Sequence, residues 1–280
     1  MLAALGLRAG PRTGREVCQL GCRSSGLTRR MSGSSPPLAA VCQLTCSPDK
    51  RANYAACRRL VEQAKERGAG MIFLPEGFDY IGSSREETLA LSESLAGDAV
   101  SQYTRLARKL KVWLSLGGFH ERGHEWETDR RIYNSHIIIN DEGDIVSVYR
   151  KSHLFDVELP GRGVSLKESA FTIPGPAVMP PVQTPIGKVL LRARAIETQC
   201  FVLAAAQVGQ HHDKRSSYGH ALAVDPWGTV MEDCGGRDAG VALVEIDLEK
   251  LRETRRNMPV QRHRRDDRFY RRMEENPAGD

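Results

Sequence analysis

The chain has 280 residues, with 40 lysines and arginines against 35 aspartates and glutamates, for a formal net charge of +5. This length accommodates one large α/β domain or two smaller ones. No apolar run approaches the ~20 residues that a bilayer-spanning helix needs, and no basic stripe interleaved with aromatic residues indicates nucleic-acid binding. We therefore expect neither a membrane nor a nucleic acid as a partner.

The seven cysteines are irregularly spaced, which does not fit a disulfide framework. Cys18/Cys22 and Cys42/Cys46 are each separated by three residues, but no second His or Cys pair follows at zinc-finger spacing. We predict reduced thiols, as in the cytosol or the mitochondrial matrix, and no metal site.

The first thirty residues contain six arginines and one acidic residue, Glu16. This composition is typical of a mitochondrial presequence, and a disordered extension is the alternative. Met31 offers a second start, so we expect a mitochondrial protein and a cytoplasmic form that begins at Met31.

The first half of the chain predicts alternating strands and helices. A buried strand is expected at 38–44, followed by a helix that opens at 47–48 and ends at Gly68, and then by a strand at 71–74 that Pro75 terminates. The apolar positions of that helix recur at i, i+3, i+4 and i+7: Cys57, Leu60, Val61 and Ala64. Further on we predict a helix at 98–110, a strand at 112–119 and a hairpin whose strands are 133–140 and 145–151.

The second half of the chain continues the α/β pattern. Residues 160–188 are rich in proline and glycine and predict an ordered loop. A strand at 201–207, a hairpin around 225–228, and a strand at 241–248 with a short helix after it complete the series. Because no linker or repeat divides the chain, we predict one layered α/β domain.

Two of the three residues with catalytic potential lie at strand ends, and the third lies in the loop after the second. Glu76 follows the buried strand at 71–74, where α/β sheets bind ligands, so it is a candidate general base. Lys151 ends the hairpin and can stabilise a developing oxyanion, and Glu158 lies in the same segment. Taken singly, each residue also fits a surface role, the lysine as an edge-strand charge that discourages aggregation.

Four sequence motifs follow one another along the chain: "FLPE", "YRKSHLFDVELP", "LLRARAIETQCFVLAAAQ" and "YGHALAVDPWGT". In these motifs the chain resembles the nitrilase superfamily of carbon–nitrogen hydrolases, from about Leu38 to about Tyr270. The resemblance implies a four-layer α-β-β-α sandwich that forms dimers. It also implies hydrolysis of a small amide, such as the amide of deaminated glutathione, without a metal or organic cofactor.

The resemblance assigns a role to each of the three candidates. Glu76 matches the general base, Lys151 the oxyanion-stabilising lysine, and Glu158 the second glutamate, which helps to position the substrate and the lysine. The family's nucleophile is a cysteine that becomes acylated as a thioester.

The stretch "TPIGKVLLRARAIETQC" joins two pieces that the family keeps apart. The strand, elbow and helix that carry the nucleophilic cysteine belong between Lys188 and Val189 and are missing. Other thiols are poor substitutes: we expect Cys200 and Cys42 to be buried in strands and Cys234 to lie exposed in a polar turn. Glu76 can activate a nucleophile but cannot replace one.

We therefore predict an extension at 1–37, a nitrilase-like domain at 38–270 with an internal deletion at 188/189, and a tail at 271–280. Without the thiol, the amidase is expected to be inactive or severely impaired. Two alternatives remain: a non-catalytic chain that binds an intact homologous chain, in place of a homodimer, and an incompletely spliced product. The missing strand is also expected to weaken the fold.

Three histidines lie outside these motifs or at their edge. His211 and His212 are neighbours in a polar segment, for which we favour a solvated loop over a metal site. His220 is predicted either to form a hydrogen bond near the site or to have a structural role at the start of a strand.

Overall fold

The structure is a computed structural model that describes residues 36–123, 125–159, 164–176, 184 and 198–259. The predicted presequence, the junction between Lys188 and Val189, and the tail at 271–280 lie outside these residues.

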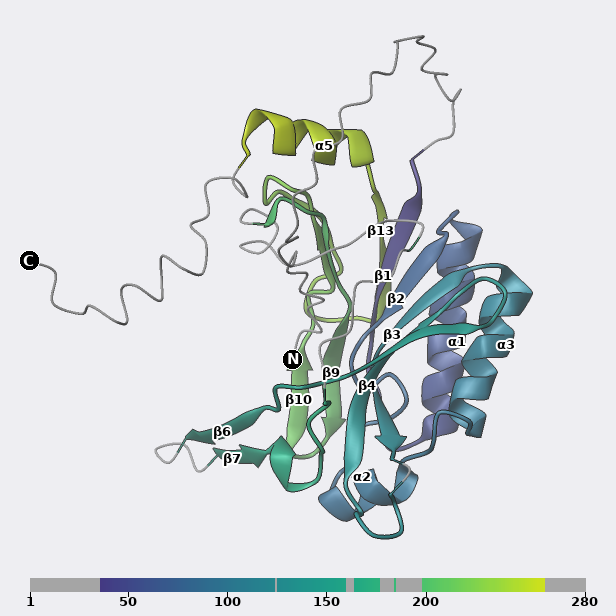
Figure 1. The fold of residues 1–280 in the computed structure, drawn as a ribbon, viewed down its shortest axis with the longest axis vertical. Helices are drawn as coiled ribbons and strands as arrows, with labels where there is room; N and C mark the ends of the chain where they lie inside the picture. Colours follow the sequence, from purple (N-terminus) through teal and green to yellow (C-terminus); the bar gives the residue numbers. More distant parts are fainter. Residues whose placement is uncertain (1–35, 124, 160–163, 177–183, 185–197, 260–280) are drawn as a thin grey trace, which may run out of the picture.

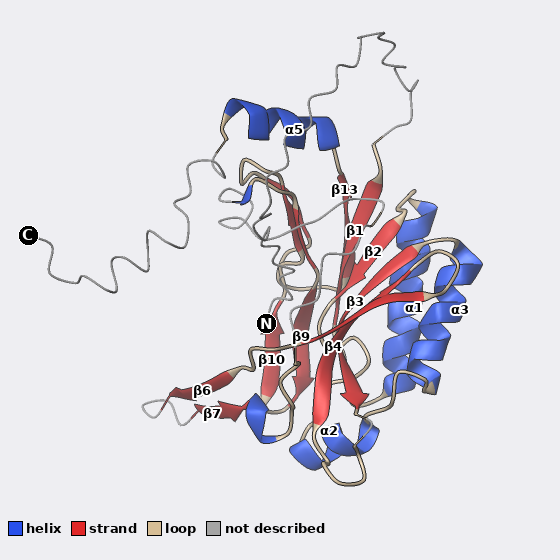
Figure 2. Ribbon diagram, in the orientation of Figure 1, coloured by secondary structure: helices blue, strands red, loops and turns tan. Residues whose placement is uncertain are grey.

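A mixed sheet of eight strands forms the body of the molecule (Figures 1 and 2). Seven strands follow the order β10-β9-β1-β2-β3-β4-β5, and β13 pairs with β1 beside β9. Their bounds are β1 Leu38–Leu44, β2 Met71–Leu74, β3 Trp113–Arg122, β4 Ile132–Ile139, β5 Ile145–Arg150, β9 Ala206–His212, β10 Arg215–Tyr218 and β13 Gly240–Glu245.

Strand β1 lies at the centre of this sheet. It runs parallel to β2 on one side, and on the other side it pairs with β13 over residues 38–43 and with β9 at residues 43–44. Six of its seven residues are buried, as expected for a strand covered on both faces. The predicted bounds of β1 and β2 are confirmed.

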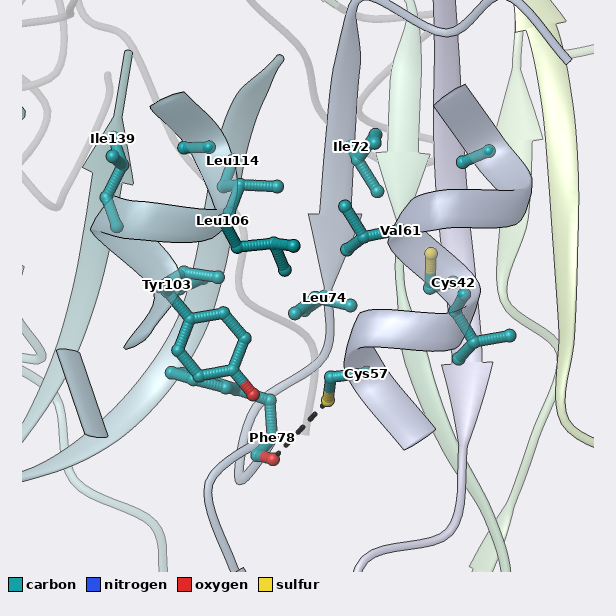
Figure 3. Packing of buried hydrophobic residues seen from close by; sticks show 14 of the residues in the cluster. Cys42, Cys57, Val61, Ile72, Leu74, Phe78, Tyr103, Leu106, Leu114 and Ile139 are labelled. Carbon is teal, nitrogen blue, oxygen red and sulfur yellow. Dashed lines mark hydrogen bonds between the residues drawn. The ribbon is translucent and has the colours of Figure 1, made fainter. Parts of the chain in front are cut away.

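Two helices cover one face of the sheet: α1 (Lys50–Glu66) and α3 (Asp98–Leu110). The Asp49 side chain caps α1 by accepting from the backbone N–H groups of Arg51 and Ala52, which starts the helix there rather than at 47–48. The predicted apolar positions of α1 are all buried. Figure 3 shows Leu106 of α3 beside Leu114 of the sheet and Val61 of α1 beside Ile72, all within one core. No helix in the described ranges has the length and apolarity that crossing a membrane requires.

The opposite face of the sheet packs against a smaller one. This second sheet has the order β12-β11-β8, formed by Val230–Asp233, Leu222–Val224 and Val202–Ala204. Side chains of β1, such as Val41, meet Leu203 and Ala223 in a second core, and α5 (Leu248–Asn257) packs against it. The described residues thus supply three of the four expected layers in a mixed α/β fold.

Three parts of the chain differ from the sequence prediction. The apolar run at 201–207 is two strands, β8 and β9, which belong to different sheets. The predicted loop at 160–188 contains β7 (Val164–Lys167), which forms a hairpin with β6 (Asp156–Leu159) just before the loop, and a 3-10 turn at Glu168–Ala170. A short helix, α2 (Arg85–Leu91), was not predicted.

The core between the helices α1 and α3 and the large sheet allows a prediction about stability. Ile72 is fully buried, so Ile72→Ala removes apolar contacts and leaves a cavity that costs about 2–5 kcal/mol of unfolding free energy. Ile145 is 39% exposed on the edge strand β5, and Ile145→Ala should cost less than about 1 kcal/mol. Urea unfolding followed by circular dichroism measures both variants. Equal losses would contradict this assignment of the core.

The buried histidine His136 in β4 predicts that the unfolding free energy depends on pH. His136 Nε2 lies 2.9 Å from Ser115 Oγ, and burial lowers the pKa of His136 to about 4. This pKa is depressed below the unfolded value of 6.5, so the full contribution of His136 to the unfolding free energy is present above pH 6.5. The contribution falls by about 3 kcal/mol as the pH drops toward 4. Urea unfolding between these pH values should show a smaller loss for His136→Gln than for the parent. His153→Gln, at an exposed histidine, should leave the loss unchanged.

Candidate active site

Glu76 lies at the carboxyl end of β2, where Pro75 ends the strand. Its carboxylate approaches β3 closely, because a Cβ at Gly118 would lie 2.4 Å from Glu76 Cγ and 2.9 Å from Asn134 Oδ1. Gly118 also has a φ of +55°, a conformation that favours glycine. A glycine at this position therefore lets Glu76 reach the polar side chains of the neighbouring strand.

Four polar side chains form one cluster at this end of the sheet, which we call the glutamate–lysine site: Glu76, Asn134, Lys151 and Glu168. Lys151 Nζ lies 2.7 Å from Glu168 Oε2 and 3.8 Å from Glu76 Oε1. Asn134 Nδ2 donates to Glu76 Oε1 at 2.7 Å and to Glu168 Oε1 at 3.0 Å. The three charged side chains are 14–27% exposed. The site thus holds two carboxylates around one ammonium group.

Glu168 is a residue that the sequence reasoning missed. It lies 17 residues after Lys151, at the start of the 3-10 turn, and also accepts from the Phe155 backbone N–H at 2.6 Å. The predicted second glutamate, Glu158, lies in β6 with its backbone opposite Ser165, and its side chain is outside the described part of the chain. Its role stays a prediction. The acidic residue just after a short alternating strand was the available signal for Glu168.

Residues at the start of β9 and just after β1 form hydrogen bonds with the loop that carries Glu76. Gln207 of β9 donates to the carbonyl oxygens of Glu76 and Gly77, both at 3.1 Å, and accepts from the Cys46 N–H. Cys46 Sγ and Cys57 Sγ lie 3.5 Å and 3.6 Å from the Phe78 carbonyl oxygen (Figure 3 shows the second contact). These contacts fix the backbone on which Glu76 stands.

Burial makes four of the five thiols in the described ranges poor nucleophiles. Burial raises the pKa of Cys42 and Cys46, and it raises the pKa of Cys57 to about 12. Cys200 is buried, as predicted, with Sγ 2.8 Å from Thr198 Oγ1. Cys234 is half-buried rather than exposed, and desolvation raises its pKa. Since the thiolate is the reactive form, these environments oppose nucleophilic attack.

The histidine predictions have mixed outcomes. The prediction of a solvated loop for His211 and His212 is wrong, because both lie in β9. His211 is 6% exposed and contacts Ser217 and the Cys46 carbonyl. His220 has a φ of +60° and pairs with Asp233 on the surface, which fits the predicted structural role. Within the described ranges, no group of three or more His, Cys, Asp and Glu side chains is arranged to hold a metal ion.

Comparison with known proteins agrees with this geometry. The Carbon-nitrogen hydrolase family profile matches residues 38–191 and 188–256. The chain is 47% identical over 273 residues to the human deaminated glutathione amidase, with 82% of this chain and 83% of the relative covered. The bovine protein of the same name is 46% identical over 285 residues, covering 85% of this chain and 86% of the relative.

Solved structures lead to the same family. The NitFhit protein of Caenorhabditis elegans superimposes with a TM-score of 0.76 at 37% identity, over 83% of this chain and 66% of that chain. Nit3 of Saccharomyces cerevisiae, at 22% identity, shares the fold with a TM-score of 0.66, over 81% of this chain and 95% of that chain. The chain therefore belongs to the carbon–nitrogen hydrolases of the nitrilase superfamily. Among its relatives it is similar to the deaminated glutathione amidases.

The contacts of Glu168 predict its contribution to stability. Glu168→Gln removes the charge partner of Lys151 and should lower the unfolding free energy by about 2 kcal/mol, since hydrogen bonds to charged groups are worth about 1.5–3 kcal/mol. The matched control is Glu142→Gln, at an exposed pair with Lys111 whose side chains are 56% and 65% exposed. That change should stay within about 1 kcal/mol. Urea unfolding measures both, and a loss no larger than the control's would mean that Glu168 does not hold Lys151.

Proposed function

We propose that this chain is the scaffold of a nitrilase-type amidase for a small 2-oxo amide, such as deaminated glutathione, in a form that lacks its thiol nucleophile. In this form it is inactive or severely impaired. The observation that carries the proposal is the glutamate–lysine site, which gathers Glu76 and Lys151 around Glu168 beside thiols that burial holds protonated.

The chemistry of the complete reaction assigns a task to each group. Glu76 would accept the proton of an attacking thiol, and later that of water. Lys151 would stabilise the oxyanion that forms on the amide carbonyl. Glu168 holds the ammonium group at 2.7 Å, which makes it a positioning residue for Lys151. We infer that Glu168 rather than Glu158 fills the place of the second glutamate.

Two features of the alignments support the proposal that a segment is missing from this chain. The alignment with the bovine relative runs over 285 positions, more than the 280 residues of this chain, yet it uses 85% of the chain. Positions of the relative must therefore lie opposite gaps in this chain. The two family matches meet at residues 188–191, the same junction that the sequence motifs indicate.

The test is turnover of deaminated glutathione by the purified chain. Release of a free amine should be no faster than for Glu76→Ala, while the human relative, assayed alongside, provides the positive control. Loss of one member of a catalytic set that acts as a unit costs several orders of magnitude in rate. Turnover clearly above the Glu76→Ala level would overturn the proposal, and Cys200→Ser would then show whether Cys200 supplies the thiol.

A second proposal is that the chain pairs with a copy of itself or with an intact homologous chain. Two exposed aromatic side chains support it: Tyr218 is 81% exposed and Trp227 is 52% exposed. Aromatic residues are enriched in protein interfaces. In the same assay, adding this chain to the human relative should change the relative's rate; an unchanged rate at excess of this chain would oppose pairing that modulates activity.

A further inference from the structure

A serine and a histidine meet on the hairpin of β9 and β10, which Figure 1 labels, and neither residue belongs to the glutamate–lysine site. His211 Nε2 lies 2.7 Å from Ser217 Oγ, and His211 Nδ1 lies 2.8 Å from the Cys46 carbonyl oxygen. A carbonyl oxygen can only accept, so Nδ1 carries the proton and Nε2 presents its lone pair. Ser217 therefore donates its hydroxyl proton to His211.

The orientation of His211 depends on an irregularity in the hairpin. Arg215 lies opposite His212 and Ser216 lies opposite Gln210, so His211 is an extra residue in β9. This arrangement is a β-bulge, which turns a side chain away from the direction that the regular strand would give it. The bulge brings the imidazole into line with Ser217, with Cys46 holding its other side.

The surroundings of His211 keep the imidazole neutral. Desolvation by burial lowers its pKa, the positive charges of Arg215 and His212 lower it further, and the hydrogen bond with the Cys46 carbonyl opposes them. A neutral imidazole at neutral pH can accept a proton, as a general base must.

Ser217 lies at the accessible side of this pair. β10 is the last strand in the order of the large sheet as described. Ser217 is half-buried, and its neighbours Ser216 and Tyr218 are exposed. A small electrophile can thus reach the hydroxyl group while the imidazole behind it remains shielded from water.

We propose that Ser217 is an acyl-accepting nucleophile, with His211 as its general base, that acts on small carboxylic esters. The Ser217 proton passes to His211 Nε2 as Oγ bonds to the acyl carbon; the ester C–O bond breaks, and the leaving alkoxide takes the proton from His211. Water then repeats the sequence, releasing the carboxylic acid and restoring the serine.

The test uses a fluorophosphonate probe on the full chain. Ser217 Oγ should displace fluoride from phosphorus, giving a phosphonylated serine that peptide mass spectrometry assigns to Ser217. His211→Gln should slow labelling about 100-fold, in the range of general-base catalysis. Ser216→Ala, at the neighbouring serine, should leave the rate unchanged, and so should Glu76→Ala, which separates this site from the amidase proposal.

A pH profile distinguishes a base from a structural contact. The labelling rate should fall only below the ordinary histidine range, since the pKa of His211 is lowered. Near-UV circular dichroism checks that His211→Gln remains folded. If this variant unfolds, the pH profile of labelling in the parent chain and the labelling of Ser217→Ala test the proposal instead. The proposal is overturned by absence of labelling at Ser217, by equal labelling of Ser216, or by a rate that a folded His211→Gln variant leaves unchanged.

Discussion

The pairing of β1 with three other strands is the constraint on which the rest of the structure depends. Residues 38–43 of this strand pair with β13, residues 39–41 with β2 and residues 43–44 with β9, and both of its faces are buried. Its alternating side chains divide the interior, with Cys42 turned toward the helices and Val41 toward the smaller sheet. Loss of any of these pairings would expose backbone groups in the centre of the protein.

The carboxyl ends of the parallel strands β1 and β2 lie at one edge, beside the amino-terminal part of β9, where Leu44 pairs with Gln207, and this explains where the polar residues gather. Gln207 at one strand and Cys46 after another hold the backbone at Glu76. The same edge places the β9–β10 hairpin against Cys46, so that His211 and Glu76 are anchored to one short segment of chain. The glutamate–lysine site and the His211–Ser217 pair are thus both anchored at Cys46, just after β1.

The sequence was informative where burial is local and periodic. The α1 face, β1 and β2 were predicted because their apolar residues follow the period of their own element. Residues 201–206 are all apolar, so no period marks the change of sheet after Ala204. Glu168 meets Lys151 because the β6–β7 hairpin turns the chain back, a contact that depends on tertiary geometry and not on spacing. Glu76 and Lys151 were predicted because they lie near strand ends within motifs that resemble those of the family.

The glutamate–lysine site does not need a thiol in order to persist. Asn134 donates to both carboxylates, Phe155 donates to Glu168, and Lys151 lies between the two glutamates, so the charged groups satisfy one another. A buried charge is costly when its partner is absent, whereas a set that is paired and hydrogen-bonded avoids this cost. Under the loss of the nucleophile that we propose, no charge among these residues is left unpaired. The stability of this polar cluster is therefore independent of the thiol that it would activate.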